Sequence, residues 1–454
     1  MDGAAAIGAT NLTRTLAERA CAITYDALPE PVRELARQCV LDYLGVGLAG
    51  ADDELVRILL DELAEAGGAA QAGVIGHSAR LPVLSAALVN GAIAHALDYD
   101  DVHLAMPGHP SVAILPALLA LAEERKSSGT AVIAAFVAGY ETCCRIGMAM
   151  RPGHYTRGFH ATGTVGAFGA AAACAHLLGL DAEATGRALG IAGTQSAGLK
   201  SQFGTMCKPF HAGKAAQSGL LAARLAARGF SSRPDLIECE QGFVATHAPD
   251  FHPAKALAEP KHGFHIYGNL FKYHAACYMT HAPIECGRQL REQLGAAPAE
   301  IAAINLSLHH ATDRVCNIPA PTDGLQAKFS LRQTVAMALA GVDTASLGAY
   351  SAATATDPAL VALRERVNFD FRQDYPEAGA EIEIELRDGR KASAKFDAGI
   401  PNSDIAAQGR RLAEKFDALA APVVGAARAR ELREAIAGLD GLQDTGVLAK
   451  LASV

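Results

Sequence analysis

The residues from 95 to 111 hold an unusual density of side chains that can take up or release protons. They read His95-Ala-Leu-Asp98-Tyr99-Asp100-Asp101-Val102-His103, followed after four residues by Gly108-His109-Pro110-Ser111. Carboxylates and imidazoles so close together could bind a divalent metal ion. They could instead orient a catalytic histidine, because a carboxylate partner fixes the tautomer of the ring and raises its basicity. A helix C-terminus with solvated acidic side chains would show the same composition, so all three interpretations stay open.

A second segment is strongly basic. Residues 184–234 contain no Asp or Glu but seven Lys or Arg, in a chain whose net charge is −8. This contrast indicates a place where an anion could be held, although an ordinary basic surface loop has the same composition. Pro209 and nearby glycines predict a loop that enters a helix, whose N-terminus would add N–H donors suited to carboxylates. The cationic and imidazole side chains at the centre of the segment are Lys200, Lys208, His211 and Lys214.

Two shorter segments carry similar chemistry. Residues 154–163 present His154, Arg157 and His160 just before a run of small residues. Residues 272–281 begin near the point where the pattern of apolar residues changes, which indicates a domain boundary, and clefts often form at domain boundaries. An isolated histidine is more often structural than catalytic, so each segment is weak evidence by itself. The side chains of interest in the second of them are Lys272, His274 and Cys277.

The elements that must position these residues are helical in the first part of the chain. Apolar residues recur there with a period near 3.6, which predicts α-helices. Gly163, Gly166 and Gly169 predict a smooth face for close helix packing, and they are not a dinucleotide fingerprint, because no strand precedes them. The predicted helices cover residues 31–48, 81–97, 116–124, 131–150 and 164–178.

The pattern changes after about residue 265. Alternating apolar and polar residues predict strands at 301–309, 380–386 and 391–396, the last two joined by an Asp388-Gly389 turn. Helices are expected between the strands, and again at 405–419 and 426–439. The expected fold is therefore mainly α with an α+β lid: a large all-helical domain (1–265), a smaller α+β lid domain (266–399), and C-terminal helices (400–454) that return to the first domain.

Composition limits the class of protein. The 454 residues exceed what one core usually holds, and half of them are apolar. Abundant Ala and Gly favour close helix packing and an extensive subunit interface. The negative net charge excludes nucleic acid and anionic membranes as expected partners. Residues 1–10 are too polar and too short to predict a signal segment, and the run 161–180 is too rich in Ala and Gly to predict a membrane span. Ten scattered cysteines without C-x-x-C spacing suit reduced thiols in a cytoplasmic protein.

Taken together, the segments resemble the MmgE/PrpD family. The strings that carry the resemblance are HALDYDD, GHPS, ILPALLALAE, GYE, RGFHATGTVGAFGAAAA, FGTMCKPFHAGKAA and AKFSLRQTVAMAL, in this order along nearly the whole chain. The combination is highly specific, although no single string is. The resemblance implies a helical domain, an α+β lid, a homodimer, and a site between the domains that needs no metal or organic cofactor. Reactions of the family include 2-methylcitrate dehydration, cis-aconitate decarboxylation and iminodisuccinate epimerisation.

The resemblance also assigns residues. It implies catalytic roles for Asp98 in the D-x-D-D string, His109 in GHPS, His160 in RGFH, Lys208 in CKP, and Lys272. From the same segments we expect substrate contacts from Asp101, His103, Lys200, His211, His274 and Cys277.

Three positions depart from the decarboxylase members of the family. Those members typically have Thr, His and Tyr where this chain has Val102, Cys277 and Val315. The differences imply a substrate other than cis-aconitate.

A mechanism follows from the residue types. The family reactions form a carbanion-like centre next to a carboxylate, whose negative charge opposes it. Lys208 and Lys272 would neutralise that charge, an effect of several kcal/mol in a preorganised site. His109 and His160 are expected to be the acid–base pair, with Asp98 orienting one ring. We expect a lyase, either dehydratase or decarboxylase; an epimerase and an inactive carboxylate-binding protein are the alternatives.

Overall fold

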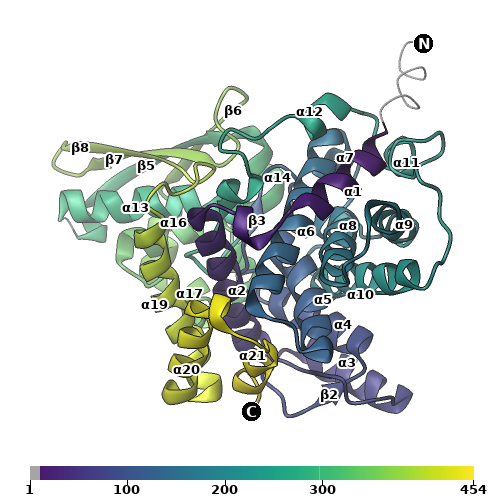
Figure 1. Cartoon of the computed structure of the whole chain (residues 1–454). Helices are drawn as coiled ribbons and strands as arrows, with labels where there is room; N and C mark the ends of the chain where they lie inside the picture. Colours follow the sequence, from purple (N-terminus) through teal and green to yellow (C-terminus); the bar gives the residue numbers. More distant parts are fainter. Residues whose placement is uncertain (1–10, 296) are drawn as a thin grey trace. The chain divides into compact units, whose positions relative to one another are not determined.

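The computed structural model describes residues 11–295 and 297–454 (Figure 1). Their contacts divide the chain into two units. The helical unit comprises the residues up to Phe271 together with Ser403–Val454, and the sheet unit comprises Lys272–Asn402. These divisions lie within a few residues of the domain boundaries expected at 265 and 400.

The helical unit is built almost entirely from helices, as its apolar periodicity predicts. Two short strand pairs correct the expectation of an all-helical domain: β1 (Ala72–Gly73) with β2 (Arg80–Leu81), and β3 (Val102–His103) with β4 (Asn269–Leu270), both antiparallel. The helices are α1 Leu12–Ala22, α2 Glu30–Gly50, α3 Glu54–Ala66, α4 Val83–His95, α5 Pro110–Arg125, α6 Gly129–Ala149, α7 Gly153–Thr156, α8 Ala161–Leu177, α9 Ala182–Gly193, α10 Cys207–Ala227, α11 Phe243–His247, α12 Pro253–Leu257, α19 Ile405–Val424, α20 Ala426–Ala437 and α21 Gly446–Leu451.

One predicted helix start is wrong. The helix expected to begin at Pro116 begins at Pro110, and Pro116 lies inside α5. A proline inside a helix lacks one N–H donor and usually interrupts the element. The first two turns of α5 are buried, so their packing stabilises the helix on both sides of Pro116.

The core of the helical unit depends on small residues. Residues Ala161 to Ala175 of α8 are all buried. A Cβ atom added to Gly166 would lie 2.5 Å from the Cβ of Ala113 on α5, which confirms the predicted close packing of this face. Helices α4 and α10 meet backbone to backbone, because a Cβ on Gly91 would lie 2.7 Å from the Cα of Gly213. This contact fixes the C-terminus of α4 relative to α10.

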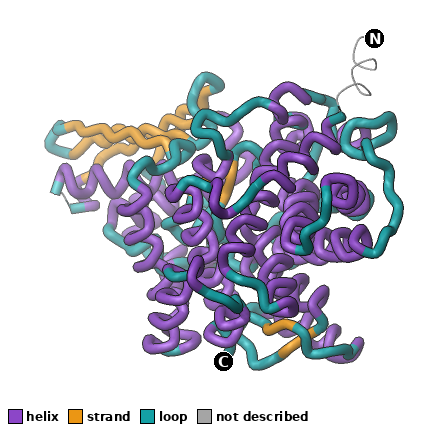
Figure 2. Tube along the Cα trace, viewed as in Figure 1, coloured by secondary structure: helices purple, strands orange, loops and turns teal. Residues whose placement is uncertain are grey.

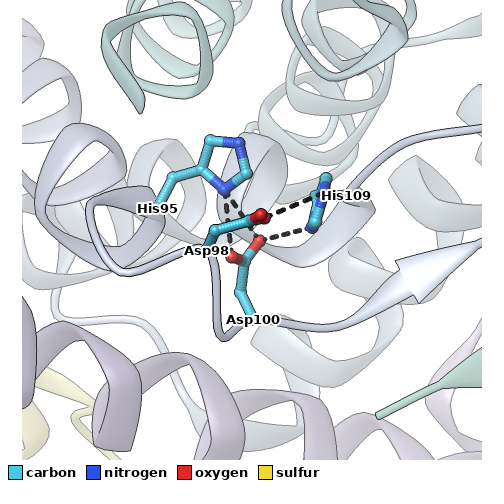
Figure 3. Close-up of side chains that lie close together, drawn as sticks. All are labelled: His95, Asp98, Asp100 and His109. Carbon is cyan, nitrogen blue, oxygen red and sulfur yellow. Dashed lines mark hydrogen bonds and ion pairs between the residues drawn. The ribbon is translucent and has the colours of Figure 1, made fainter. Parts of the chain in front are cut away.

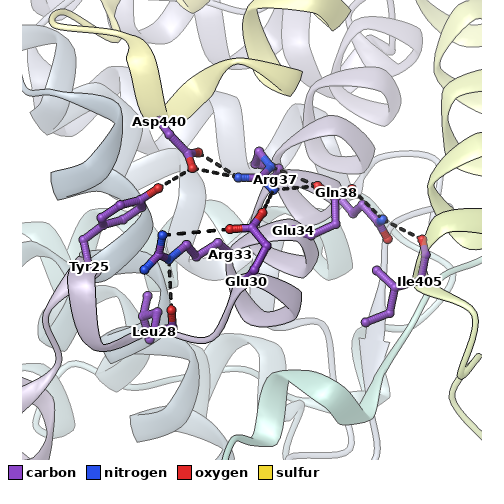
Figure 4. Close-up of polar contacts among 9 residues, drawn as sticks. All are labelled: Tyr25, Leu28, Glu30, Arg33, Glu34, Arg37, Gln38, Ile405 and Asp440. Atoms are coloured by element: carbon purple, nitrogen blue, oxygen red, sulfur yellow. Dashed lines mark hydrogen bonds and ion pairs between the residues drawn. The ribbon is translucent and has the colours of Figure 1, made fainter.

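The C-terminal helices are tied to α2 by polar contacts (Figure 4). Arg37 Nη1 contacts both carboxylate oxygens of Asp440 at 2.9 and 2.8 Å, and Tyr25 donates a hydrogen bond to the same carboxylate. Gln38 Nε2 donates to the carbonyl oxygen of Ile405 at 3.0 Å. The return of the last helices to the first part of the chain therefore rests on specific bonds as well as on apolar packing.

The sheet unit contains one four-stranded sheet, drawn in orange in Figure 2. Its order is β6-β5-β7-β8, with β5 and β6 parallel and the other pairs antiparallel. Strand β6 was not predicted, although Val367, Phe369 and Phe371 alternate with polar residues there. The elements are β5 Ile301–His309, β6 Val367–Arg372, β7 Gly379–Leu386, β8 Lys391–Asp397, α13 His281–Leu294, α14 Asp313–Cys316, α15 Gly324–Lys328, α16 Leu331–Ala340, α17 Ala352–Ala355 and α18 Pro358–Arg364.

Among the described residues, one helix is long and apolar enough to cross a membrane. It is α6, and 89% of its most apolar window is buried inside the structure. Core helices of soluble proteins pass the same test of length and composition, so this helix is weak evidence for a membrane span.

Candidate active site

Four side chains from the string of residues 95–109 lie together in the helical unit (Figure 3). We call His95, Asp98, Asp100 and His109 the His–Asp cluster. His95 is the last residue of α4, the two aspartates follow in the next loop, and His109 is the N-cap residue of α5. Their nearest nitrogen and oxygen atoms all lie within 4.8 Å of one another.

The loop after α4 turns sharply at Asp98. Its φ angle of 51° lies in the left-handed region, which aspartate tolerates better than most residues. The Asp98 N–H donates to the carbonyl oxygen of His95 at 3.2 Å, which closes the turn. The carboxylates of Asp98 and Asp100 both reach His109 from this loop, at 3.7 Å from Nε2 and 2.9 Å from Nδ1 respectively.

Asp100 is shared by two imidazoles. His95 Nδ1 lies 3.0 and 3.1 Å from its two carboxylate oxygens, and His109 Nδ1 lies 2.9 Å from one of them. Burial would raise the pKa of Asp100, but His109 and His95 hold it well below its usual range. Burial lowers the pKa of His95 to about 4 despite the opposing effect of Asp100. Near neutral pH the cluster therefore contains an ionised Asp100 and a neutral His95.

Lys208 brings a cation to the cluster. It lies in the first turn of α10, and its Nζ is 2.7 Å from Asp98 Oδ1. The Lys208 side chain is only 12% exposed and also lies 5.4 Å from the ring centroid of Phe203. The close crossing of α4 and α10 at Gly91 and Gly213 explains why the start of one helix meets the end of the other.

His160 adds a third imidazole. It is the N-cap residue of α8, and its ring stacks on that of His95 with centroids 5.8 Å apart. Its Nδ1 lies 3.1 Å from Nδ1 of the half-buried His211. Burial, together with the neighbouring His95 and Lys208, holds the pKa of His160 well below its usual range. His160 is therefore neutral near pH 7.

His109 is placed against the start of α8. Its backbone N–H donates to Thr162 Oγ1 at 3.0 Å. The preceding residue must be small, because a Cβ on Gly108 would lie 2.9 Å from the backbone nitrogen of Thr162. The GHP string thus brings His109 and the neighbourhood of His160 together, although about fifty residues separate them in sequence.

The side chains of the cluster are of the types that bind metal ions, but their carboxylates already contact Lys208 and the two imidazoles. Two carboxylates and two imidazoles within this distance could bind a divalent cation. Lys208 Nζ stands 2.7 Å from one of these carboxylates, and both imidazoles direct Nδ1 at the other. A metal ion would have to displace the ammonium and break the imidazole contacts. The geometry favours proton transfer around a fixed ammonium over metal binding.

Comparison with known proteins settles the family. The model of the MmgE/PrpD N-terminal domain matches residues 14–255, and that of the MmgE/PrpD C-terminal domain matches residues 274–441. The chain belongs to the MmgE/PrpD family.

Curated relatives match over almost the full length. A cis-aconitate decarboxylase of Aspergillus terreus is 28% identical over 476 residues, which cover 97% of this chain and 96% of that protein. The human cis-aconitate decarboxylase is 27% identical, over 97% of this chain and 94% of that protein. The mouse protein of the same name is also 27% identical, over 97% and 93%. The expectation that this MmgE/PrpD chain is a lyase-type enzyme is confirmed by these matches.

Asp101, a predicted substrate contact of this MmgE/PrpD chain, is buried beside the cluster. Ser111 Oγ donates a hydrogen bond to its Oδ2, and its buried Oδ1 has no hydrogen-bond partner among the described residues. Burial raises the pKa of Asp101 to about 7, and the nearby Asp42 adds to the effect. Asp101 and Ser111 thus form a second contact beside the one between Asp100 and His109.

Two other predicted contacts are occupied elsewhere in the helical unit. His103 binds backbone atoms with both ring nitrogens, at 2.8 Å to the His265 carbonyl oxygen and 3.0 Å to the Ala105 N–H. Lys200 Nζ donates to the Tyr155 carbonyl oxygen at 3.2 Å and lies over the Tyr155 ring. The structure does not bring these two residues into the His–Asp cluster.

Three predicted residues belong to the sheet unit. Lys272 and His274 are each only 1% exposed, and Cys277 is also buried. His274 Nε2 lies 3.0 Å from Glu285 Oε1, and its Nδ1 lies 2.8 Å from Thr344 Oγ1. The roles implied for Lys272, His274 and Cys277 stay predictions.

Sequence reasoning did not select His95 or Asp100 as site residues, although both lie in the string that it singled out. The sequence feature that could have identified them is a His and an Asp five residues apart on either side of a predicted helix end. Only the left-handed conformation of Asp98 shows that Asp100 folds back onto the end of α4.

Proposed function

We propose that this protein is a lyase that dehydrates or decarboxylates a small di- or tricarboxylic acid by proton transfer, without a metal ion. The single observation that carries the proposal is the arrangement of His109 between an ionised carboxylate and an ammonium-paired carboxylate, at 2.9 and 3.7 Å. A histidine oriented by a buried carboxylate is a common general base. The names of the full-length relatives support a small polycarboxylate as substrate.

Lys208 holds the substrate in this proposal. Its ammonium is mostly buried, so it interacts with a carboxylate more strongly than a surface lysine would. It stabilises both the bound carboxylate and the negative charge that develops on it as the neighbouring carbon becomes carbanion-like. Asp98 keeps the ammonium in place before the substrate arrives.

His109 transfers the proton. Its Nδ1 faces Asp100, so its Nε2 is the nitrogen available to the substrate. In a dehydration, a C–H bond breaks and its proton goes to His109, while the C–O bond to the leaving hydroxyl breaks. The ionised Asp100 stabilises the imidazolium that forms. In a decarboxylation, the reaction starts from the imidazolium form of His109: the C–C bond breaks, carbon dioxide leaves, and the carbanion takes the Nε2 proton, which leaves the ring neutral.

His160 is the second proton-transfer group. Its pKa is held well below the usual range by burial, by His95 and by Lys208, so it is neutral near pH 7 and its N–H can donate a hydrogen bond to the leaving hydroxyl, which takes the proton that His109 accepted and departs as water. Its contact with His211 at 3.1 Å offers a route by which a proton is replaced from the half-buried ring. His109 and His160 lie in different surroundings, as the two members of an acid–base pair must if they are to play different roles.

Substrate choice is expected to differ from that of the decarboxylase members. Val102 is buried in β3 next to the cluster loop, where those members typically have Thr. A hydroxyl group that could bind a substrate oxygen is thus replaced by a methyl group. This replacement supports a substrate other than cis-aconitate.

The proposal is tested by turnover. The chelator-treated protein is incubated in D2O with citrate, 2-methylcitrate, cis-aconitate, tartrate and aspartate-derived acids, and proton NMR follows each acid. Loss of water or carbon dioxide from one of them supports the lyase. Deuterium entry next to a carboxylate with neither loss identifies an epimerase instead. Carboxylate binding with no reaction across the panel and its close homologues contradicts the proposal and indicates an inactive binding protein.

A further inference from the structure

His95 is a buried imidazole for which the mechanism above has no step. It ends α4, is 1% exposed, and has both oxygens of Asp100 within 3.1 Å of its Nδ1. Its other nitrogen, Nε2, is buried without a hydrogen-bond partner among the described residues. An unsatisfied buried polar atom costs stability, and an apolar residue would avoid that cost. The hydrogen bonds that the imidazole makes to Asp100 both come from its Nδ1.

The hydrogen positions around Asp100 follow from which atoms can donate a hydrogen bond and which can only accept one. An ionised carboxylate only accepts hydrogen bonds, so each nitrogen that faces it must carry a hydrogen. His95 directs Nδ1 at Asp100 in a hydrogen bond, and His109 Nδ1 lies 2.9 Å from the same carboxylate at ion-pair distance, without hydrogen-bond geometry. Asp100 thus holds His95 in the tautomer with its hydrogen on Nδ1, and its negative charge favours the same tautomer for His109. For His109 this leaves Nε2 free to accept a proton.

We propose that His95 is a positioning residue, whose Nδ1–H anchors Asp100 so that this carboxylate fixes the tautomer and the basicity of His109. The effect of His95 on kcat rests on the proposed function, whereas the effect of His95 on the His109 ring does not. His95 does not touch the substrate in this account. It acts through Asp100, which it orients from the opposite side to His109.

The direction of the effect follows from competition between donors. His95 donates its Nδ1–H to Asp100 while the His109 ring lies beside the same carboxylate, so the hydrogen bond from His95 weakens the attraction that Asp100 exerts on the His109 proton. Without His95, Asp100 attracts the His109 proton more strongly, and the imidazolium form of His109 persists to higher pH. The charged and titratable groups that face His109 are Asp98 and Asp100 from the loop, His95 from α4, His160 from α8 and Lys208 from α10. His95 contributes a hydrogen bond and no charge, because burial lowers its pKa to about 4.

The test compares His95→Leu with His95→Asn. Leucine has a similar volume and no donor, whereas the amide nitrogen of asparagine occupies nearly the position of Nδ1. Nitrogen-15 NMR of histidine-labelled protein follows the His109 ring from pH 5 to 9, with His109→Asn for assignment. We expect His95→Leu to move the titration of His109 upward by at least half a pH unit, and His95→Asn to restore it. No substrate is needed for this measurement.

Kinetics give the second readout. With a substrate found by the NMR panel, kcat should fall about 10- to 100-fold in His95→Leu while KM changes little, and His95→Asn should recover most of it. The acid limb of the pH profile should move upward with the titration of His109. If His95→Leu does not fold, His95→Gln replaces it, because its amide lies near Nε2 and leaves Asp100 without the donor.

An unchanged His109 titration in His95→Leu, or an equal defect in His95→Asn, overturns the positioning role. A shifted titration in a protein that turns over no acid leaves the positioning role intact and removes the proposed function. The two failures are therefore distinguishable.

Discussion

Lys208 Nζ lies 2.7 Å from Asp98 Oδ1, although the two residues come from different elements far apart in the sequence. The ammonium is held at the His–Asp cluster by a carboxylate that does not belong to a substrate. A bound carboxylate must share this ammonium with Asp98, which limits how tightly the ground state is bound. Charge that develops during the reaction gains more from the same contact, and this difference accelerates the chemical step.

Replacing Lys208 should separate its charge from its shape. We expect Lys208→Met to lower kcat/KM about 100- to 1000-fold, because a preorganised charge at the reacting centre is lost. Lys208→Arg should recover only part of the activity, since a guanidinium cannot occupy the same position beside Asp98. The matched control is Lys214→Met on the same helix, where Nζ binds Gln217 Oε1 at 2.5 Å. Steady-state kinetics showing equal losses in Lys208→Met and Lys214→Met would contradict a specific role for Lys208.

Buried histidines should make the protein sensitive to acid. Burial lowers the pKa of His95, His103 and His154 to about 4 each, below the value near 6.5 of an unfolded chain. The unfolded state therefore binds more protons between pH 4 and 6.5, and stability falls as the pH falls through this window, by up to about 3 kcal/mol for each histidine. Asp101 and Glu141 act in the opposite direction, because their pKa values are raised to about 7 mainly by burial.

Urea unfolding at pH 7 and pH 5 measures this balance. We expect a lower free energy of unfolding at pH 5, because the histidines outnumber the two carboxyl groups. His103→Gln keeps a side-chain donor for the His265 carbonyl but cannot titrate, so it should reduce the difference between the two pH values. An unchanged difference in this variant would show that His103 does not contribute to the acid sensitivity.

Lys415 should stabilise the loop that carries Asp98 and Asp100 through a contact with its backbone. Its Nζ lies 2.6 Å from Asp42 Oδ1 and donates to the Tyr99 carbonyl oxygen at 2.8 Å, between the two aspartates of the cluster. Lys415→Met leaves Asp42 buried without this cation, which should cost about 3–5 kcal/mol of stability. It should also lower kcat, because Asp98 and Asp100 lose a backbone anchor.

The double variant Asp42→Asn/Lys415→Met should recover most of the stability but not the kcat. Urea unfolding and kinetics check both results. Arg433→Met, which breaks the exposed pair with Asp417, is the control and should change stability by less than about 1 kcal/mol. Full recovery of kcat in the double variant would show that the Tyr99 contact does not position the loop.

Much of the helical unit could be predicted from periodicity, because its helices bury long apolar faces. The exceptions have physical reasons. Pro116 is a helix breaker by local preference, and only the burial of α5 on both sides of it overrides that preference. The strand pair of β3 and β4 joins residues far apart in sequence, and two-residue strands leave no alternating pattern to read.

The candidate site could be predicted as far as its residue types and family strings reach. Asp98, His109, His160 and Lys208 were expected, and the structure places them around one cluster in the helical unit. The shared role of Asp100 could not be predicted, because it depends on the left-handed turn at Asp98. The contact of Lys415 with Tyr99 could not be predicted either, since nothing in the sequence links residues from opposite ends of the chain.

The central claim is that His109 moves a proton at a substrate carbon without a metal ion. The most direct measurement compares the chelator-treated wild-type protein with His109→Ala in D2O, using the acid on which the wild type acts and proton NMR. Circular dichroism and the thermal midpoint confirm that the variant is folded. We predict turnover and solvent deuterium in the product for the wild type, and a loss of at least about 1000-fold for His109→Ala. Undiminished turnover by the folded variant, or turnover that requires an added metal ion, would contradict the account.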